Sequence, residues 1–355
     1  MPRPLLAFLV AALFLPRPAW AQPVESLEDS PGQEKLEREA SRVADLEVLR
    51  RRALKEKKQK PAPAVPRFKH YLELSQGAGY ESNPRRNASR TGDAFLENTL
   101  AAALSKKLSP RWSWQGFYYG SFTNYLEYGD GDYAYQTLTP LKLLWKPAQT
   151  WRLDLEMEVG DLLFPSSSVH NYRWLRPSVG AQQELPGGFL HAGQLDWQIR
   201  KYGSQKAKSG SGAETLDDRV DTRPRVRYEI GNAWKRTVAK VRQEWYWNDS
   251  NDARNDFYDA QGYKVTASLR QKITKKLLAD IGYSFERRNY RKRPVTGITS
   301  EARYDDTHTW SLSGLYELNE TWRIGSSFSY RFLDSNDPTG EYVDATITGT
   351  VSARL

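Results

Sequence analysis

The sequence predicts an all-β fold, namely a transmembrane antiparallel up-and-down β-barrel of about 14 strands preceded by a short periplasmic α-helix. Three observations predict it. A secretory signal opens the chain, apolar and polar residues alternate along most of residues 69–355, and the connections between alternating segments are short and long in turn. Membrane barrels place short turns at one rim and long loops at the other.

Residues 1–21 have the pattern of a cleaved signal peptide. Arg3 supplies a charged start, residues 5–15 form an apolar run, and Ala19-Trp20-Ala21 gives the small residues that flank a cleavage site. The apolar run is shorter than the roughly 20 residues that a membrane-spanning helix needs. We therefore expect an exported chain that begins at Gln22 after cleavage.

Residues 22–60 form a periplasmic leader with an amphipathic helix. Leu36, Val43, Leu46 and Leu49 recur on one helical stripe, and the segment ends in a run of Arg and Lys. We expect these four residues to form a partner-binding face. The helix could self-associate, dock on a periplasmic protein partner, plug the barrel, or remain a lone solvated helix. Residues 61–68 are a stiff, Pro-rich linker.

Residues 69–355 form the predicted outer-membrane barrel. In the last segment Val343, Ile347, Val351 and Leu355 are apolar, whereas Asp, Thr, Ser and Arg residues alternate with that apolar face. Such a strand presents one face to lipid and the other to a wet lumen. The predicted strands are 69–80, 94–107, 111–125, 134–146, 151–163, 172–184, 189–202, 219–231, 236–248, 259–272, 276–289, 304–317, 321–333 and 342–355.

The number and length of these segments favour a membrane barrel over a soluble β-sandwich. Fourteen is an even number, as a single-chain bacterial barrel requires. Soluble strands usually have about five or six residues, and these segments are roughly twice as long. The longer predicted loops include 203–218 and 290–303.

Short and long connections alternate along the chain, and short turns belong at the periplasmic rim of a membrane barrel. This alternation places both chain ends in the periplasm.

The composition agrees with a bacterial outer-membrane location. The chain has 12 Trp, 20 Tyr and 12 Phe, and such aromatic rings gather at the two membrane interfaces. It has no Cys, which excludes a lipid-anchored lipoprotein and a disulfide framework. The expected partners are outer-membrane lipid and the barrel-assembly machinery. The machinery is expected to bind the C-terminal strand. No nucleic-acid partner is expected for an exported chain, despite its net charge of +9.

Two aromatic clusters are best explained as interface girdles, with stacking on sugar rings as the alternative. Their members are Trp112, Trp114, Phe117, Tyr118, Tyr119 and Phe122, and Trp245, Tyr246 and Trp247.

Rows of charged residues are the candidates for lumen lining and ion selectivity. The acidic row is Asp154, Glu156 and Glu158, and the basic rows are Arg223, Arg225 and Arg227, and Lys240 with Arg242. Opposed rows across a narrow pore would create a transverse field that orients polar solutes. The alternative is that these charges pair with their neighbours and fill a small lumen.

The run from Gly77 to Pro84 reads G-A-G-Y-E-S-N-P. It resembles the end of the first barrel strand in the surface lipoprotein assembly modifier family and in related repeat-linked outer-membrane barrels. The resemblance implies a C-terminal barrel of about fourteen strands. It also implies export or assembly of surface proteins or polysaccharide with a periplasmic partner, although those families carry helical repeats where this chain has one short helix.

The expected function is that of a porin-like channel for small polar solutes or a polymer, with the export or assembly role as the alternative. We expect no enzyme, no cofactor and no metal. The sequence offers four histidines, and none has the spacing of a catalytic base beside its orienting group. They are His70, His170, His191 and His308.

Overall fold

The computed structural model describes residues 68–84, 91–166, 168–234, 236–253 and 258–355. The predicted signal peptide, the helix carrying Leu36, Val43, Leu46 and Leu49, and the linker up to residue 67 lie outside the described residues. Within the described part, no helix has the length and apolar character needed to cross a bilayer.

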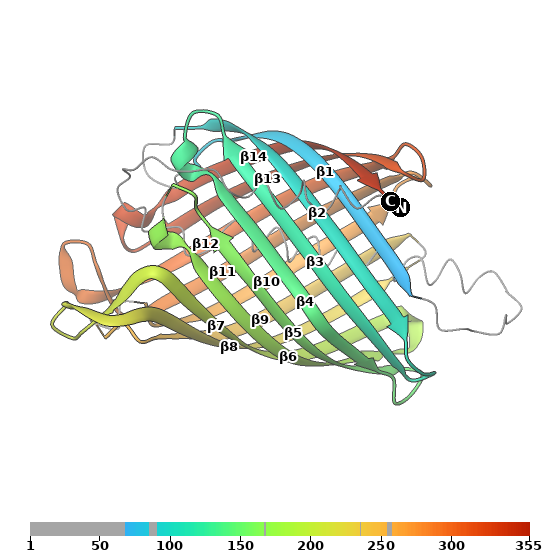
Figure 1. The fold of residues 1–355 in the computed structure, drawn as a ribbon, viewed down its shortest axis with the longest axis horizontal. Coiled ribbons are helices and arrows are strands. Elements are labelled where there is room, and N and C mark those ends of the chain that lie inside the picture. Colours follow the sequence, from blue (N-terminus) through green and yellow to red (C-terminus); the bar gives the residue numbers. More distant parts are fainter. Residues whose placement is uncertain (1–67, 85–90, 167, 235, 254–257) are drawn as a thin grey trace, which may run out of the picture.

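In the part of the chain that the structure describes, fourteen antiparallel strands form one closed barrel, which confirms the predicted barrel fold (Figure 1). Each strand pairs with its neighbours in sequence, and β1 pairs with β14, so the sheet has no free edge. The strands are β1 (Lys69–Glu81), β2 (Asp93–Lys107), β3 (Trp112–Tyr125), β4 (Tyr133–Trp145), β5 (Trp151–Leu163), β6 (Tyr172–Glu184), β7 (Phe189–Lys208), β8 (Glu214–Ala233), β9 (Thr237–Ser250), β10 (Ala260–Lys272), β11 (Leu277–Val295), β12 (Ile298–Glu317), β13 (Trp322–Ser335) and β14 (Tyr342–Arg354).

Among the described residues, four single turns of 3₁₀ helix lie in the connections between strands. They are η1 (Gly129–Gly131), η2 (Ser168–His170), η3 (Pro186–Gly188) and η4 (Pro338–Gly340). The first described strand starts, and the last one ends, at the rim that carries the short turns.

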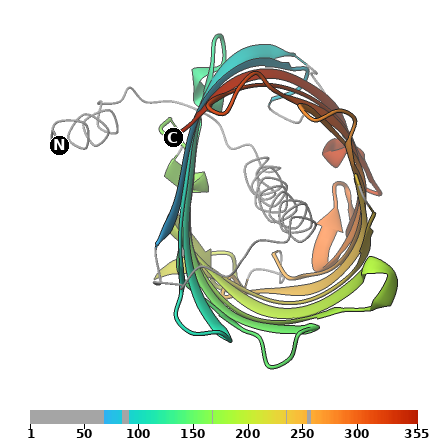
Figure 2. The same ribbon diagram turned by 90° about the vertical axis from the view of Figure 1, so that its right-hand side faces the viewer.

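The two faces of the wall differ as the alternation predicts. Leu195, Ile281 and Val351 lie on the outer face, each about half exposed. Their neighbours in sequence, such as Asp196 and Ser352, lie on the inner face and are buried. Figure 2 shows the strands as a closed ring. This arrangement suits a bilayer, because neighbouring strands hydrogen-bond around the closed ring and most of the outer side chains are apolar.

Two hairpins extend beyond the barrel wall, where the sequence analysis wrongly placed loops at 203–218 and 290–303. β7 continues to Lys208 and β8 begins at Glu214, while β11 and β12 meet at a two-residue turn with Gly297 at φ 81°. The charged and small residues favoured a loop assignment. In the hairpins these charges find partners across the strands, because antiparallel pairing brings opposite charges together.

Charge pairing in the β7–β8 hairpin centres on Asp218. Lys206 Nζ lies 2.7 Å from Asp218 Oδ1 and Lys201 Nζ lies 3.4 Å from Oδ2. Hydrogen bonds from Lys206 and Lys201 hold the pKa of the Asp218 carboxyl below its ordinary value. The hairpin therefore keeps this carboxylate ionised.

The motif around Ser82 and Asn83 closes the seam between the first and last strands. The Asn83 amide nitrogen donates to Asp344 Oδ1 at 3.2 Å, and its side-chain Nδ2 donates to the Val343 carbonyl at 3.1 Å. The Ala345 amide donates to Ser82 Oγ at 2.7 Å. Asn83 and Asp344 are both buried. This local clamp gives the motif a structural role at the one junction that joins distant parts of the chain.

We expect Asn83→Ala to lower the free energy of unfolding by about 1–2 kcal/mol, because it leaves the part-buried Val343 carbonyl without this donor. The midpoint of urea unfolding in detergent, followed by tryptophan fluorescence, measures the change. Asn124→Ala is the matched control, since it removes one bond to Asp132 within an ordinary hairpin. Equal midpoints for the two variants would contradict a special role for the seam clamp.

Candidate functional site

The predicted lumen residues lie on the inner phase of their strands, that is, at the alternate positions whose side chains point into the barrel. Asp154, Glu156 and Glu158 are on β5, Arg223, Arg225 and Arg227 are on β8, and Lys240 and Arg242 are on β9. Their outward neighbours, such as Leu155, Val226 and Val241, are exposed and apolar. The alternation therefore places all of these charged side chains on the inner wall, and the remaining question is what they contact there.

A buried network of four charges joins β7, β8 and β9. Arg225 Nε lies 3.1 Å from both carboxylate oxygens of Asp196, and one of its terminal nitrogens lies 3.2 Å from Glu244 Oε2. Arg227 contacts the same two acids at 3.4 and 3.3 Å. We call Asp196, Arg225, Arg227 and Glu244 the β7–β9 charge network. Two positive and two negative groups balance one another in it.

The other basic residues of the rows also have close neighbours. Glu229 accepts a hydrogen bond from Arg242 at 2.9 Å and lies 3.4 Å from Lys240 Nζ. Arg223 donates to Asn248 at 3.1 Å and lies over the Tyr246 ring, 4.8 Å from its centroid. The structure thus favours the alternative in which the basic rows pair with their neighbours along this part of the wall.

The acidic row on β5 is only partly paired. Glu158 accepts from Arg176 at 2.7 Å and from the Trp174 indole at 3.0 Å, and Glu156 pairs with Lys142. Within the described part of the chain, Asp154 has no ion pair or side-chain hydrogen bond. Its carboxylate lies above Gly180, where an added Cβ would sit 2.8 Å from Oδ2. Gly180 therefore leaves room for an unneutralised, half-buried carboxylate on the inner wall.

Charge is distributed unevenly around the lumen. Because the ring closes through fourteen strands, β1–β5 lie across the barrel from β8–β12. On the inner phase of β1–β5 acids predominate: Glu73, Glu81, Asp93, Glu97, Asp154, Glu156 and Glu158, against Lys69, Lys107, Lys142 and Arg152. On β8–β12 bases predominate: Arg219, Arg223, Arg225, Arg227, Lys240, Arg242, Lys264, Arg270, Lys272, Arg288, Arg293 and Arg303, against Asp217, Asp221, Glu229, Glu244, Asp280, Glu286, Glu301, Asp305 and Glu317. An acidic wall thus faces a basic wall.

Aromatic residues also line part of the inner wall, which corrects the assignment of both aromatic clusters to membrane girdles. Trp112, Trp114, Tyr118 and Phe122, and Trp245 with Trp247, lie on the outer phase, whereas Phe117, Tyr119 and Tyr246 lie on the inner phase. A run of consecutive aromatic residues cannot all face lipid, because side chains of a strand alternate. The inner residues join a buried cluster near the long-loop rim: Phe95, Tyr119, Tyr125, Tyr133, Tyr135, Leu162, Phe164, Tyr172, Trp174 and Tyr202.

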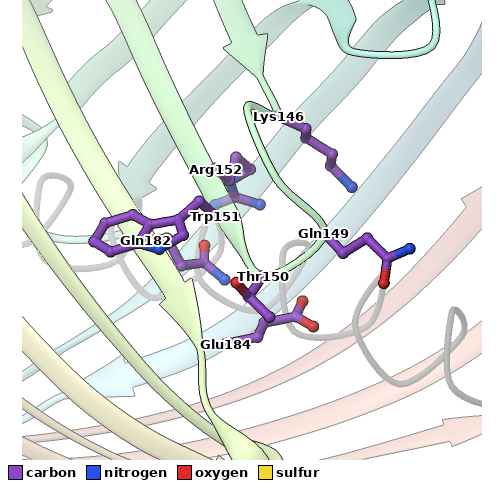
Figure 3. Close-up of a pocket in the computed structure, with 7 residues that line it drawn as sticks. All are labelled: Lys146, Gln149, Thr150, Trp151, Arg152, Gln182 and Glu184. Atoms are coloured by element: carbon purple, nitrogen blue, oxygen red, sulfur yellow. The ribbon is translucent and has the colours of Figure 1, made fainter.

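A small pocket of about 30 Å³ lies beside the β4–β5 turn at the short-turn rim. Its lining residues are Lys146, Gln149, Thr150, Trp151, Arg152, Gln182 and Glu184 (Figure 3). This volume has room for a few water molecules, so the pocket is no binding site for a large solute.

The histidines lie in three different settings. His191 and His308 are on the outer wall, where His191 pairs with Gln183 at 2.8 Å and the His308 ring stacks on Phe332 at 4.4 Å. His170 lies on η2, and its ring is roughly perpendicular to that of Phe164 at a centroid distance of 6.0 Å. His70 is exposed near the start of β1. Within the described residues, no group of three or more His, Asp or Glu side chains is arranged to hold a metal ion.

The acidic partners of the basic rows were not among the predicted site residues. Asp196, Glu229 and Glu244 share the inner phase with those bases, and that phase was a readable signal. The sequence alone could not show which acid pairs with which base, because that depends on which residues of neighbouring strands stand opposite each other.

Comparison with solved structures finds the same type of fold. The chain is similar to outer-membrane-expressed OmpT of Vibrio cholerae, with a TM-score of 0.51 and 11% identity over 84% of this chain and 100% of that one. In-vitro folded OmpT, an outer membrane protein of Vibrio cholerae, gives a TM-score of 0.50 and 9% identity over 83% and 99% of the two chains. No protein-family model and no curated protein sequence matches the chain. These similarities show an outer-membrane β-barrel fold.

Proposed function

We propose that this chain is an outer-membrane channel for small polar solutes, whose ion selectivity is set by charges on its inner wall. The observation that supports this proposal is a closed barrel with a largely apolar outer face and, inside it, an acidic wall across from a basic wall. Such walls produce a transverse field that orients a dipolar or charged solute and holds it away from the barrel axis.

Two parts of the inner wall have different roles in this proposal. The β7–β9 charge network is balanced and buried, so it fixes the shape of the wall and adds little net charge. Asp154 is half-buried and lacks an ion pair among the described residues, so its charge acts on passing ions. Asp154, rather than Arg225, is thus the residue that we assign to selectivity.

In this proposal both chain ends face the periplasm, because the first and last strands end at the short-turn rim. Residues 22–66 would then lie on the periplasmic side. The chain is not an enzyme in this proposal, and the positions of His191 and His308 on the outer wall support that part of it.

The export or assembly role has less support. The motif that resembles the surface lipoprotein assembly modifier family, Gly77 to Pro84, has a structural explanation at the β1–β14 seam. That seam is hydrogen-bonded from Glu73 to Glu81, and the Leu355 amide also donates to the Leu72 carbonyl at 2.9 Å. A fully paired seam favours passage through the lumen over lateral opening of the wall.

The test is the reversal potential of single channels in a planar bilayer under a KCl gradient. We expect Asp154→Asn to lower the ratio of cation to anion permeability by about threefold, since it removes one unit charge at short range from the ion path. Asp249→Asn is the matched control, because Asp249 lies on the outer phase of β9. Its permeability ratio should stay at the wild-type value.

Absence of current from a folded and inserted barrel would contradict the channel proposal. The same measurement on a chain lacking residues 22–66 then distinguishes two causes. Current that appears only after this deletion would place the obstruction in that segment, and continued absence of current would mean that the wall itself fills the lumen.

A further inference from the structure

A group of polar side chains lies on the outer wall at β1–β4. Gln76, Asn98 and Gln136 are exposed on the outer phase, and the Tyr118 hydroxyl lies beside Gln136. We call Gln76, Asn98, Tyr118 and Gln136 the outer polar patch. Gln76 and Asn98 stand directly opposite each other in the β1–β2 pairing, so two amide side chains lie side by side on this face.

These two amides lie near the middle of the membrane-facing band. On β1, Gln76 is midway between Leu72, near the short-turn end, and Tyr80, near the long-loop end. Leu74 and Ala78, its neighbours on the outer phase, are apolar. Lipid hydrocarbon would therefore surround the Gln76 and Asn98 amides if nothing else covered them.

Hydrogen bonding divides the outer polar patch into two parts. Gln136 Nε2 donates to Asp161 Oδ2 at 3.1 Å, and the Tyr118 hydroxyl donates to Gln136 Oε1 at 3.5 Å. Among the described residues, neither the Gln76 nor the Asn98 amide takes part in a side-chain hydrogen bond. An amide in hydrocarbon without a hydrogen-bond partner is costly. A protein partner on this face would remove that cost.

Small residues lie on one side of the amides, whereas Val351 and Phe122 stand directly opposite Gln76 and Asn98. Ala78 flanks Gln76, and Gly349 lies on the outer phase of β14 with no atom within 4 Å of an added Cβ. On the opposite side of the barrel, β9 presents Trp245 and Trp247 instead. Small residues beside polar ones are typical of contacts between membrane-embedded protein surfaces.

We propose that the face centred on Gln76 and Asn98 is the contact surface for a second copy of this chain. A carboxamide both donates and accepts hydrogen bonds, so a patch of amides is complementary to itself. A two-fold contact places the same patch on both copies, and each amide then finds a partner in the other patch. This inference does not depend on the channel proposal, because it concerns the outer wall alone.

Crosslinking of single introduced cysteines tests the proposal directly, since the chain itself contains no Cys. Ala78→Cys places one thiol beside Gln76, and Ala267→Cys places one on the outer phase of β10, across the barrel. Both variants are reconstituted in vesicles at the same protein-to-lipid ratio and treated with a short bis-maleimide. We expect a covalent dimer from Ala78→Cys and only monomer from Ala267→Cys. Equal yields, or monomer from both, would overturn the proposal.

A second pair of variants tests the amides themselves. Replacing Gln76 and Asn98 with Leu makes the wall more apolar, so the barrel should insert normally. We expect the double variant to associate about three- to tenfold more weakly, as measured by energy transfer between labelled copies in vesicles. Gln243→Leu, on the outer phase of β9, is the control and should leave association unchanged. Unchanged association of the double variant would overturn the proposal.

Discussion

Arg225→Met is expected to lower the free energy of unfolding by about 3–5 kcal/mol, because it leaves buried carboxylates without a counter-charge. Arg225 contacts Asp196 and Glu244, whose side chains are 1% and 4% exposed. Arg227 remains beside both acids but cannot supply the lost hydrogen bonds of Arg225. The measurement is the midpoint of urea unfolding of the refolded barrel in detergent.

Two further variants show whether the burial of the network causes this loss. Arg287→Met removes an arginine that pairs with Asp306 near the long-loop rim, with its own side chain 50% exposed. It should cost no more than about 1 kcal/mol, because exposed ion pairs contribute little. Adding Asp196→Asn to Arg225→Met should recover part of the stability by removing an unpaired charge. A loss that is equal for Arg225→Met and Arg287→Met would contradict the assigned role of the network.

Gly160→Ala is expected to destabilise the barrel by about 3 kcal/mol through overpacking. Gly160 lies on the inner phase of β5, and an added Cβ would sit 2.2 Å from a ring carbon of Trp174 and 2.5 Å from the Gln136 carbonyl oxygen. The indole would have to move away from the wall. It would then lose its hydrogen bond to the buried Glu158 carboxylate and its packing against Tyr135.

Gly193→Ala is the matched control, because nothing lies within 4 Å of an added Cβ there. Its unfolding midpoint should match that of the wild type. The emission spectrum of Trp174, read in a variant that lacks the other tryptophans, should shift to longer wavelength in Gly160→Ala as the ring becomes more exposed. A folded Gly160→Ala barrel with wild-type stability and an unshifted spectrum would refute this account.

The alternation of the sequence determined the barrel and the face that each side chain occupies. Its period of two placed Asp154, Arg225 and Arg227 on the inner wall, and the even number of segments agreed with a closed ring. This was possible because the side of the sheet that a residue faces is a local property of a pleated strand, independent of its neighbours.

The tertiary structure decided which residues meet. It paired Arg225 with Asp196 and Glu244, and it brought Asn83 to Asp344, which lies 261 residues further along the chain. It also extended two hairpins that the sequence suggested as loops, and it left Gln76 opposite Asn98 on the outer wall. Register and ring closure fix these contacts, and both depend on how all the strands stagger around the barrel. No local stretch of sequence contains that information.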